Sequence, residues 1–111
     1  MADPAYLGEF EQLTLLAVLR LGTDASGAAI ARELEQAAGR RVSRGALYTT
    51  LDRLEGKGLL RWKLTTGGPQ RNNLPRRTYL VTARGLDALR TSQRTLQRMW
   101  RGLGRLLKEG S

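Results

Sequence analysis

The side chains of this chain that are best suited to chemistry are its arginines, and the chemistry they suit is anion binding. The 111 residues hold 19 lysines and arginines against 10 acids, a formal net charge of +9. Only Lys57, Lys63 and Lys108 are lysines. The planar guanidinium group of arginine offers paired N–H donors that match phosphate oxygens and guanine edges. The composition therefore makes nucleic acid the leading class of partner.

The positive charge is concentrated in one part of the chain. Residues 1–42 hold 4 arginines and 6 acids, a net charge of −2, whereas residues 43–111 hold 15 basic residues and 4 acids, a net charge of +11. A genome that favours arginine codons would explain arginine in place of lysine, but not this imbalance. The second part of the chain is therefore the predicted binding region.

The sequence gives little indication of catalysis or metal binding. It contains no cysteine and no histidine, so the usual thiolate and imidazole groups are missing. The acids show no paired arrangement of the kind used in acid–base catalysis. We therefore expect no enzyme activity, no cofactor and no metal site.

The same sequence predicts a cytoplasmic protein with no membrane contact. The longest apolar run, from Leu13 to Leu19, is shorter than the ~20 residues that a bilayer span needs. The first ten residues lack the basic and apolar regions of a signal peptide.

One predicted helix, which begins after Ser43, carries the candidate recognition surface. Three leucines at the spacing i, i+4, i+7 form its apolar stripe: Leu47, Leu51 and Leu54. At about 100° per residue, the N-terminal end, one flank and the outer face carry the candidate DNA-binding residues Ser43, Arg44, Gly45, Tyr48, Thr49 and Arg53.

These residue types suit a nucleic-acid surface. Arg44 and Arg53 can bind phosphate or guanine, Tyr48 offers a hydroxyl to a phosphate, and Gly45 leaves room for a DNA backbone to approach. An ordinary solvated helix face is the alternative, and the helix alone does not decide between them.

A basic hairpin follows this helix and favours the nucleic-acid interpretation. Residues 60–65 alternate between apolar and polar types, which predicts a half-buried strand, and residues 78–81 predict a short return strand. We interpret residues 66–77 as a loop, because its prolines do not fit inside paired strands. The predicted DNA-binding arginines of this loop are Arg71, Arg76 and Arg77. A merely solvated loop would leave these neighbouring arginines unexplained.

The predicted order of elements is α-α-α-β-β-α, which is the plan of a winged helix-turn-helix. The first helix covers residues 8–21, and the second begins at a cap, Asp24 or Ser26, and ends near Ala38. The predicted fold class is therefore mainly α with a small β-hairpin. Residues 1–81 would form the winged-helix DNA-binding domain, and residues 82–111 a single C-terminal dimerisation helix.

The apolar pattern of the last predicted helix indicates a homodimer. Its apolar residues follow a 3-4 spacing that is typical of a coiled-coil seam, with one polar residue that would fix the register. The predicted interface residues are Leu86, Leu89, Gln93, Leu96, Trp100, Leu103 and Leu107. The alternative is that this stripe packs only on its own domain. We favour the interface, helped by the first helix, because a final helix this long extends beyond a small core.

Three motifs resemble the short members of the PadR family of transcriptional regulators. They are LGEFEQLTLLAVL, LYTTLDRLEGKGLL and TYLVTARGLDAL. The middle motif is the most specific and matches the family at Leu47, Tyr48, Leu51, Arg53, Leu54, Glu55, Gly58 and Leu59. The resemblance implies a dimeric winged-helix repressor that binds a double-stranded operator and dimerises through its C-terminal helix. The wing departs from the family pattern, because it is longer and contains Pro69 and Pro75.

Two questions stay open at this point. Regulators that resemble this chain include some that bind planar molecules between aromatic side chains, so Trp100, with Met99 and Phe10, is either part of an inducer site or an apolar anchor of the interface. The sequence favours the anchor. An RNA-binding or ribosome-associated winged helix would also explain the charge, though not the seam, and a winged helix that binds only proteins would leave the basic surface unexplained.

Overall fold

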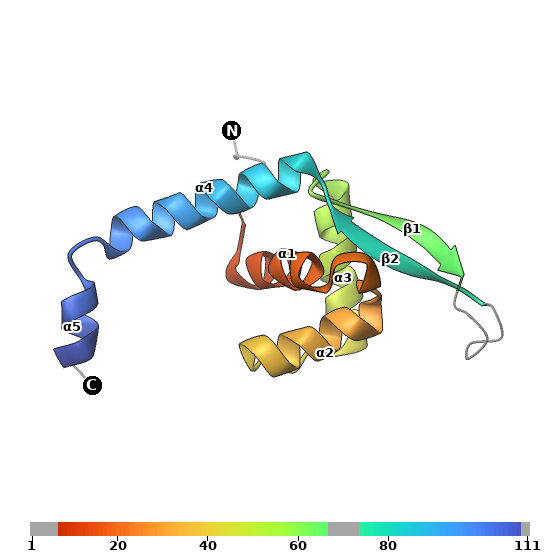
Figure 1. Ribbon diagram of the computed structural model, residues 1–111, viewed down its shortest axis with the longest axis horizontal. Coiled ribbons are helices and arrows are strands. Elements are labelled where there is room, and N and C mark those ends of the chain that lie inside the picture. The colour runs from red at the N-terminus through yellow and green to blue at the C-terminus, as the bar shows by residue number, and fades with distance from the viewer. Residues whose placement is uncertain (1–6, 67–73, 110–111) are drawn as a thin grey trace.

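The structure, a computed structural model, describes residues 7–66 and 74–109 and confirms the predicted mainly helical fold with a small hairpin. Its elements are α1 (Glu9–Leu21), the short 3-10 helix η1 (Gly22–Asp24), α2 (Gly27–Ala38), α3 (Arg44–Gly56), β1 (Leu60–Thr66), β2 (Pro75–Val81), α4 (Ala83–Trp100) and α5 (Gly104–Glu109). Helices α1, α2 and α3 form a compact group, the hairpin projects from it on one side, and α4 and α5 extend on the other (Figure 1).

Leucine side chains from all three N-terminal helices meet the base of the hairpin in one core. The predicted stripe of α3 is buried, since Leu47, Leu51 and Leu54 are each no more than 1% exposed. Ile30 and Leu34 of α2 and Leu60 and Tyr79 of the hairpin complete this layer. Such a core fixes the orientation of α3, so that its opposite face is held outward.

Serine and threonine caps set where three of the helices begin. Of the two candidates for α2, Ser26 is the cap, because its Oγ accepts a hydrogen bond from the backbone N–H of Ala29 at 3.2 Å. Ser43 caps α3 in the same way through Ala46, at 3.1 Å. Thr82 caps α4 and also donates its hydroxyl hydrogen to the carbonyl of Gly58, at 2.7 Å. The start of α4 is thereby tied to the end of α3.

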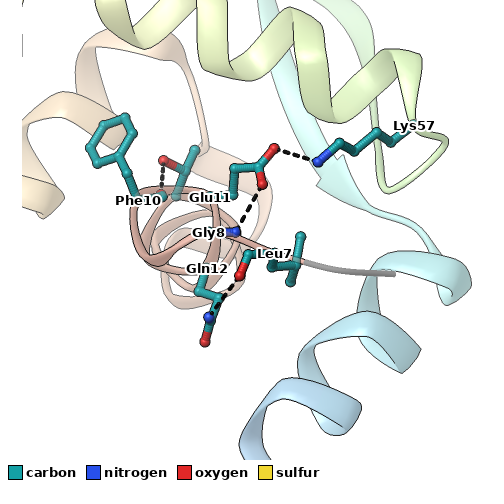
Figure 2. Close-up of polar contacts among 7 residues, drawn as sticks. Leu7, Gly8, Phe10, Glu11, Gln12 and Lys57 are labelled. Carbon is teal, nitrogen blue, oxygen red and sulfur yellow. Dashed lines mark hydrogen bonds and ion pairs between the residues drawn. The ribbon is translucent and has the colours of Figure 1, made fainter. Parts of the chain in front are cut away.

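A buried carboxylate joins the beginning of α1 to the end of α3. Glu11 accepts hydrogen bonds from the backbone N–H of Gly8, at 3.0 Å, and from Nζ of Lys57, at 2.8 Å (Figure 2). Burial alone would raise the pKa of Glu11, but the hydrogen bonds from Lys57 and Gly8, with the charges of Lys57 and Arg53, outweigh it and lower that pKa overall. The ionised form of Glu11 therefore stabilises the fold.

The second strand begins earlier than predicted. Strand β2 starts at Pro75, which lies opposite Thr66 at the end of the ladder, so Arg76 and Arg77 belong to the strand and the prediction that they lie in a loop is wrong. Proline is excluded from the interior of paired strands but is tolerated as the first residue, where no ladder N–H is needed. Of the predicted loop, residues 67–73 lie outside the described residues, and Thr66 is the last residue of β1.

The base of the hairpin is fastened to the turn before α2. The backbone N–H of Tyr79 donates to the carbonyl of Ala25 at 2.9 Å, and Ser26 forms an isolated antiparallel bridge with Thr78. Because Ser26 is also the cap of α2, this contact places the first turn of α2 beside β2.

The single C-terminal helix that the seam predicted is broken. Helix α4 ends at Trp100, and a turn with Gly102 at a φ of 82° leads into α5. Glycine reaches this left-handed conformation readily and weakens a helix interior by about 1 kcal/mol relative to alanine. Leu103 and Leu107 therefore do not continue the face of α4.

Candidate nucleic-acid interface

A groove of about 770 Å³ lies where the N-terminal ends of α2 and α3 meet the first residues of β2, near the loop end of the hairpin. Four arginines line it: Arg32, Arg44, Arg76 and Arg77. Asp24 is the one acid among the described residues that line it. The surface of this groove therefore combines an excess of positive charge with the positive end of the α2 and α3 helix dipoles.

The arginines of the groove are not neutralised by the described part of the chain. Elsewhere arginines pair with acids, as Arg20 does with Glu33 and Arg40 with Glu9. Within residues 7–66 and 74–109, no ion pair involves an arginine that lines the groove. The Nε of Arg76 is buried and has no hydrogen-bond partner there. Unpaired guanidinium groups around a concave surface are suited to an anion from outside the chain.

Tyr48 covers the first turn of α2 within this groove. A Cβ atom on Gly27 would collide with the Tyr48 hydroxyl group, so the phenol rests directly on the glycine. Tyr48 remains 36% exposed. Its hydroxyl therefore sits at a helix N-terminus, next to the groove, where it can donate to an oxygen of a bound phosphate.

A second tyrosine lies beneath the arginines of the hairpin. Burial raises the pKa of Tyr79, and the guanidinium of Arg77 acts in the opposite direction. Weaker effects of Tyr48 and Asp52 also raise this pKa. Arg77 therefore lies close to Tyr79, and it lines the groove together with Tyr48.

The groove brings together some of the predicted DNA-binding residues and leaves others apart. Arg44, Tyr48, Arg76 and Arg77 all line it. Ser43 uses its hydroxyl group as the cap of α3. Arg71 lies outside the described residues.

The remaining predicted residues of α3 lie beyond the groove lining, and all three are exposed. Thr49 donates its hydroxyl hydrogen to the carbonyl of Gly45 at 2.9 Å, and nothing lies within 4 Å of a Cβ atom built on Gly45. Arg53 lies toward the other end of α3, where its charge acts on Glu11.

Sequence reasoning missed Arg32. It lies on α2, outside the helix and loop that the charge pattern singled out, yet it lines the groove. The available clue was its place two residues after Ile30 and two before Leu34, which puts it away from the buried stripe of an amphipathic helix. The folded position of α2 beside α3 was still needed to bring Arg32 to this surface.

The predicted interface and inducer residues divide between exposed and packed positions. Leu96, Trp100, Leu103 and Leu107 are 44–59% exposed, and Met99 is 69% exposed. Gln93 is exposed as well, whereas Leu86 and Leu89 are half-buried near the start of α4. Phe10 packs against the core in the first turn of α1, with the guanidinium of Arg40 5.5 Å from the centre of its ring.

A helical trio with a two-stranded wing and a cationic groove beside its third helix is the architecture of a winged helix-turn-helix regulator. A family model described as the transcriptional regulator PadR-like family matches residues 15–91. The chain therefore belongs to the PadR-like family of transcriptional regulators, as the sequence motifs indicated. No curated protein matches it.

Solved structures of other proteins share the fold of this chain. A PadR family transcriptional regulator from Eggerthella lenta is 30% identical, with a TM-score of 0.61 over 86% of this chain and 84% of that chain. A complex structure of hsRosR-S4 is 27% identical, with a TM-score of 0.64 over 96% of this chain and 85% of the other.

Bacillus subtilis PadR in complex with operator DNA is 22% identical, with a TM-score of 0.62 over 77% of this chain and 48% of that chain. At this identity the likeness concerns the fold alone. Within the described part of this chain, no helix is both long enough and apolar enough to span a membrane.

Proposed function

We propose that this protein is a sequence-specific regulator of transcription that binds double-stranded DNA and represses its target genes as a homodimer. The observation that carries this proposal is the groove at the N-terminal ends of α2 and α3, whose four arginines form no ion pair within the described residues. Phosphate oxygens of a DNA backbone have the charge and the hydrogen-bond acceptors that such a groove needs. The solved complex of Bacillus subtilis PadR with operator DNA, which has the same fold, also supports it.

Helix α3 is the element that we propose reads the bases. Its apolar face is buried, and its outer face is exposed from Arg44 to Thr49, apart from Leu47. The first turn carries Gly45, over which the surface is open, so a DNA strand can come close to the helix. In helix-turn-helix proteins the N-terminal residues of the second helix of the motif contact base edges in the major groove.

Double-stranded DNA suits this arrangement better than RNA does. The major groove of B-form DNA admits an α-helix, whereas that of an A-form RNA helix is too deep and narrow for side chains to read. Single-stranded RNA is bound mainly by exposed aromatic platforms. The described part of the hairpin instead presents Arg76 and Arg77, near the loop end of β2. The RNA-binding alternative is therefore the less favoured one.

Exposed apolar side chains support the homodimer. Leu96, Met99 and Trp100 stand out from the end of α4, and Leu16 and Leu19 from α1. A monomer of this size rarely keeps so many large apolar side chains in water, whereas a second copy of the chain would cover them. In this arrangement Trp100 is an apolar anchor of the interface.

A two-fold symmetric dimer implies an operator with two-fold symmetry. Each α3 would read one half-site, with centres separated by about one helical turn, roughly 10 base pairs. If each subunit neutralises three to five phosphates, binding should weaken by about a thousandfold or more between 50 and 200 mM salt.

A footprint on the DNA upstream of the gene itself, followed by titration of the protected duplex, tests the proposal. The Arg44→Ala variant should weaken binding and lower the salt slope by about one, and it should alter base preference if Arg44 reads a base. Arg90→Ala is the matched control, because it removes the same charge from α4, where Arg90 pairs locally with Asp87. A protected site without dyad symmetry, or equal affinity for single-stranded RNA, would overturn the proposal.

A further inference from the structure

Arg77 is held against an aromatic ring. In the hairpin Trp62 lies opposite Tyr79, and Arg77 lies two residues before Tyr79 on β2. Side chains that are diagonal neighbours on one face of an antiparallel pair are within reach of each other when they are long or aromatic. The guanidinium carbon of Arg77 accordingly lies 4.1 Å from the centre of the Trp62 ring. At this distance the cation is stacked on the indole.

The neighbouring arginine provides an internal comparison. Arg76 lies on the opposite face of β2, across from Thr65, and has no such aromatic contact within the described chain. Both arginines nevertheless line the same groove. Two adjacent side chains of one type therefore reach one anion-binding surface, and only Arg77 is held by an aromatic partner.

Stacking orders an arginine without occupying its hydrogen-bond donors. An exposed arginine loses rotamer freedom when it binds a phosphate, and this loss weakens binding. A guanidinium that already lies over a ring has lost part of that freedom, and N–H groups at the edge of its plane can still donate to a phosphate oxygen. Arg77 is exposed and Trp62 is half-buried, so the ring is fixed and the cation remains accessible.

We propose that Trp62 is a positioning residue of the DNA interface, whose indole ring holds the guanidinium of Arg77 at the groove for a backbone phosphate. This inference rests on the proposed function, because it assigns Trp62 a role in that same interface. Trp62 acts through Arg77 and need not touch the DNA. A purely structural role, in which Trp62 only packs the hairpin, would not depend on Arg77.

A double-mutant cycle separates these two roles. Binding to a fluorescent 20-base-pair duplex of mixed sequence at low salt is measured by anisotropy for Trp62→Leu, Arg77→Ala and the double variant. Trp62→Leu should weaken binding by roughly two- to fivefold, the range of an exposed cation–π contact. In the Arg77→Ala background the same change should have no further effect. In the Arg76→Ala background the full loss should remain, and Trp62→Phe should restore part of the affinity.

A second measurement tests the contact without DNA. The chain has two tryptophans, so Trp100→Phe leaves Trp62 as the sole indole fluorophore. Arg77→Ala should shift the emission of Trp62 in this background, whereas Arg76→Ala should leave it nearly unchanged. Equal shifts from both variants would overturn the inference.

The outcomes distinguish failure of the inference from failure of the proposed function. If the wild-type protein binds the duplex but Trp62→Leu weakens binding equally with and without Arg77, Trp62 only supports the hairpin and the inference is wrong. Unchanged binding by Trp62→Leu would also refute it. If the wild-type protein does not bind duplex DNA at all, the proposed function itself fails, whatever the fluorescence of Trp62 reports.

Discussion

Leucine residues have opposite surroundings in two regions of this molecule. The body, residues 7–66 and 74–89, buries Leu51 and Leu54 completely between its helices. The arm, residues 90–109, leaves Leu106 and Leu107 62% and 59% exposed. In the body the chain itself covers the buried faces of α1, α2 and α3, although Leu16 and Leu19 of α1 stay exposed, whereas the arm extends away from the body (Figure 1). From this difference we infer that a partner outside the chain covers the apolar side chains of the arm.

Polar contacts also differ between the two regions, because those of the body join distant elements and those of the arm are local. In the body, Lys57 and Glu11 join elements that are 46 residues apart in the sequence. At the arm, Arg90 pairs with Asp87 and Arg98 donates to Thr95, each across only three residues. Local contacts of this kind stabilise a helix but do not dock it on another element. The body is therefore fixed by its own tertiary contacts, and we infer that the arm depends on dimerisation.

The largest expected effect comes from changes that disrupt the proposed dimer contact of the arm. Replacing Leu96 and Leu103 together with lysine places two charges among the exposed apolar side chains, so a dimer should separate into monomers. Sedimentation equilibrium should then give the mass of one 12.3 kDa chain. The circular dichroism of the helices of the body should be retained, because neither residue belongs to its core.

A matched control adds the same charge to the other side of α4. Thr91 and Thr95 are exposed and lie about 140° and 100° from Leu96 on a helix with 100° per residue, outside the predicted seam. Thr91→Lys with Thr95→Lys should therefore leave the dimer intact. A dimer that survives the Leu96 and Leu103 changes would place the interface elsewhere.

The next effect compares one leucine from each region. Leu51→Ala should destabilise the protein by about 2–5 kcal/mol, because it removes a fully buried side chain and leaves a cavity. Leu106→Ala should change stability by less than about 0.5 kcal/mol, since this exposed side chain lies off the predicted seam. Urea unfolding at a fixed protein concentration measures both. A large loss from Leu106→Ala would show that the arm has a buried side that the comparison misses.

The sequence predicted the body well because its local patterns and its tertiary contacts agree. The stripe of Leu47, Leu51 and Leu54 predicted both α3 and its buried face, and Ser43 predicted where the helix begins. The effect of Gly102 on the C-terminal helix was harder to predict from the sequence. A heptad pattern extends through Gly102, but the left-handed conformation of this residue ends the helix regularity that the pattern assumes.

The candidate site could be predicted only in part. Arg44 and Tyr48 follow from the helical wheel of α3, since one element carries them both. Arg32 joins them through the packing of α2 against α3, which no local pattern encodes. The strand position of Arg77 was missed because Pro75 was taken to exclude a strand, although proline is compatible with the first residue of one.

A smaller effect tests the long-range polar contact of the body. Glu11→Ala should cost about 1–3 kcal/mol, because it leaves the amino group of Lys57 and the N–H of Gly8 without their buried partner. Since the pKa of Glu11 is lowered in the folded state, its contribution is fully present above the ordinary pKa of a glutamate and is lost as the pH falls through the folded value. Urea midpoints between pH 7 and pH 3 should show this loss.

The control for Glu11 is a carboxylate without long-range contacts. Among the residues that the structure describes, Asp87 pairs only with Arg90, three residues further along α4, and its side chain is 74% exposed. Asp87→Ala should therefore change the stability little, and its pH dependence should follow that of the wild-type protein. If Glu11→Ala keeps the full pH dependence of the wild type between pH 5 and pH 3, the ionised Glu11 does not stabilise the body.

The smallest effect concerns two glycines, one in each region, above which the surface is open. Nothing lies within 4 Å of a Cβ atom built on Gly45 of α3 or on Gly104 of α5. Alanine at either position should raise the stability slightly, by at most about 1 kcal/mol, because it favours the helix. Only at Gly45 should the added methyl group weaken binding to operator DNA, since we propose that a DNA strand approaches α3 there.

Thermal unfolding measures the change in stability, and anisotropy titrations measure the change in DNA affinity. Equal DNA affinity for Gly45→Ala, Gly104→Ala and the wild-type protein would show that DNA does not come close to the first turn of α3.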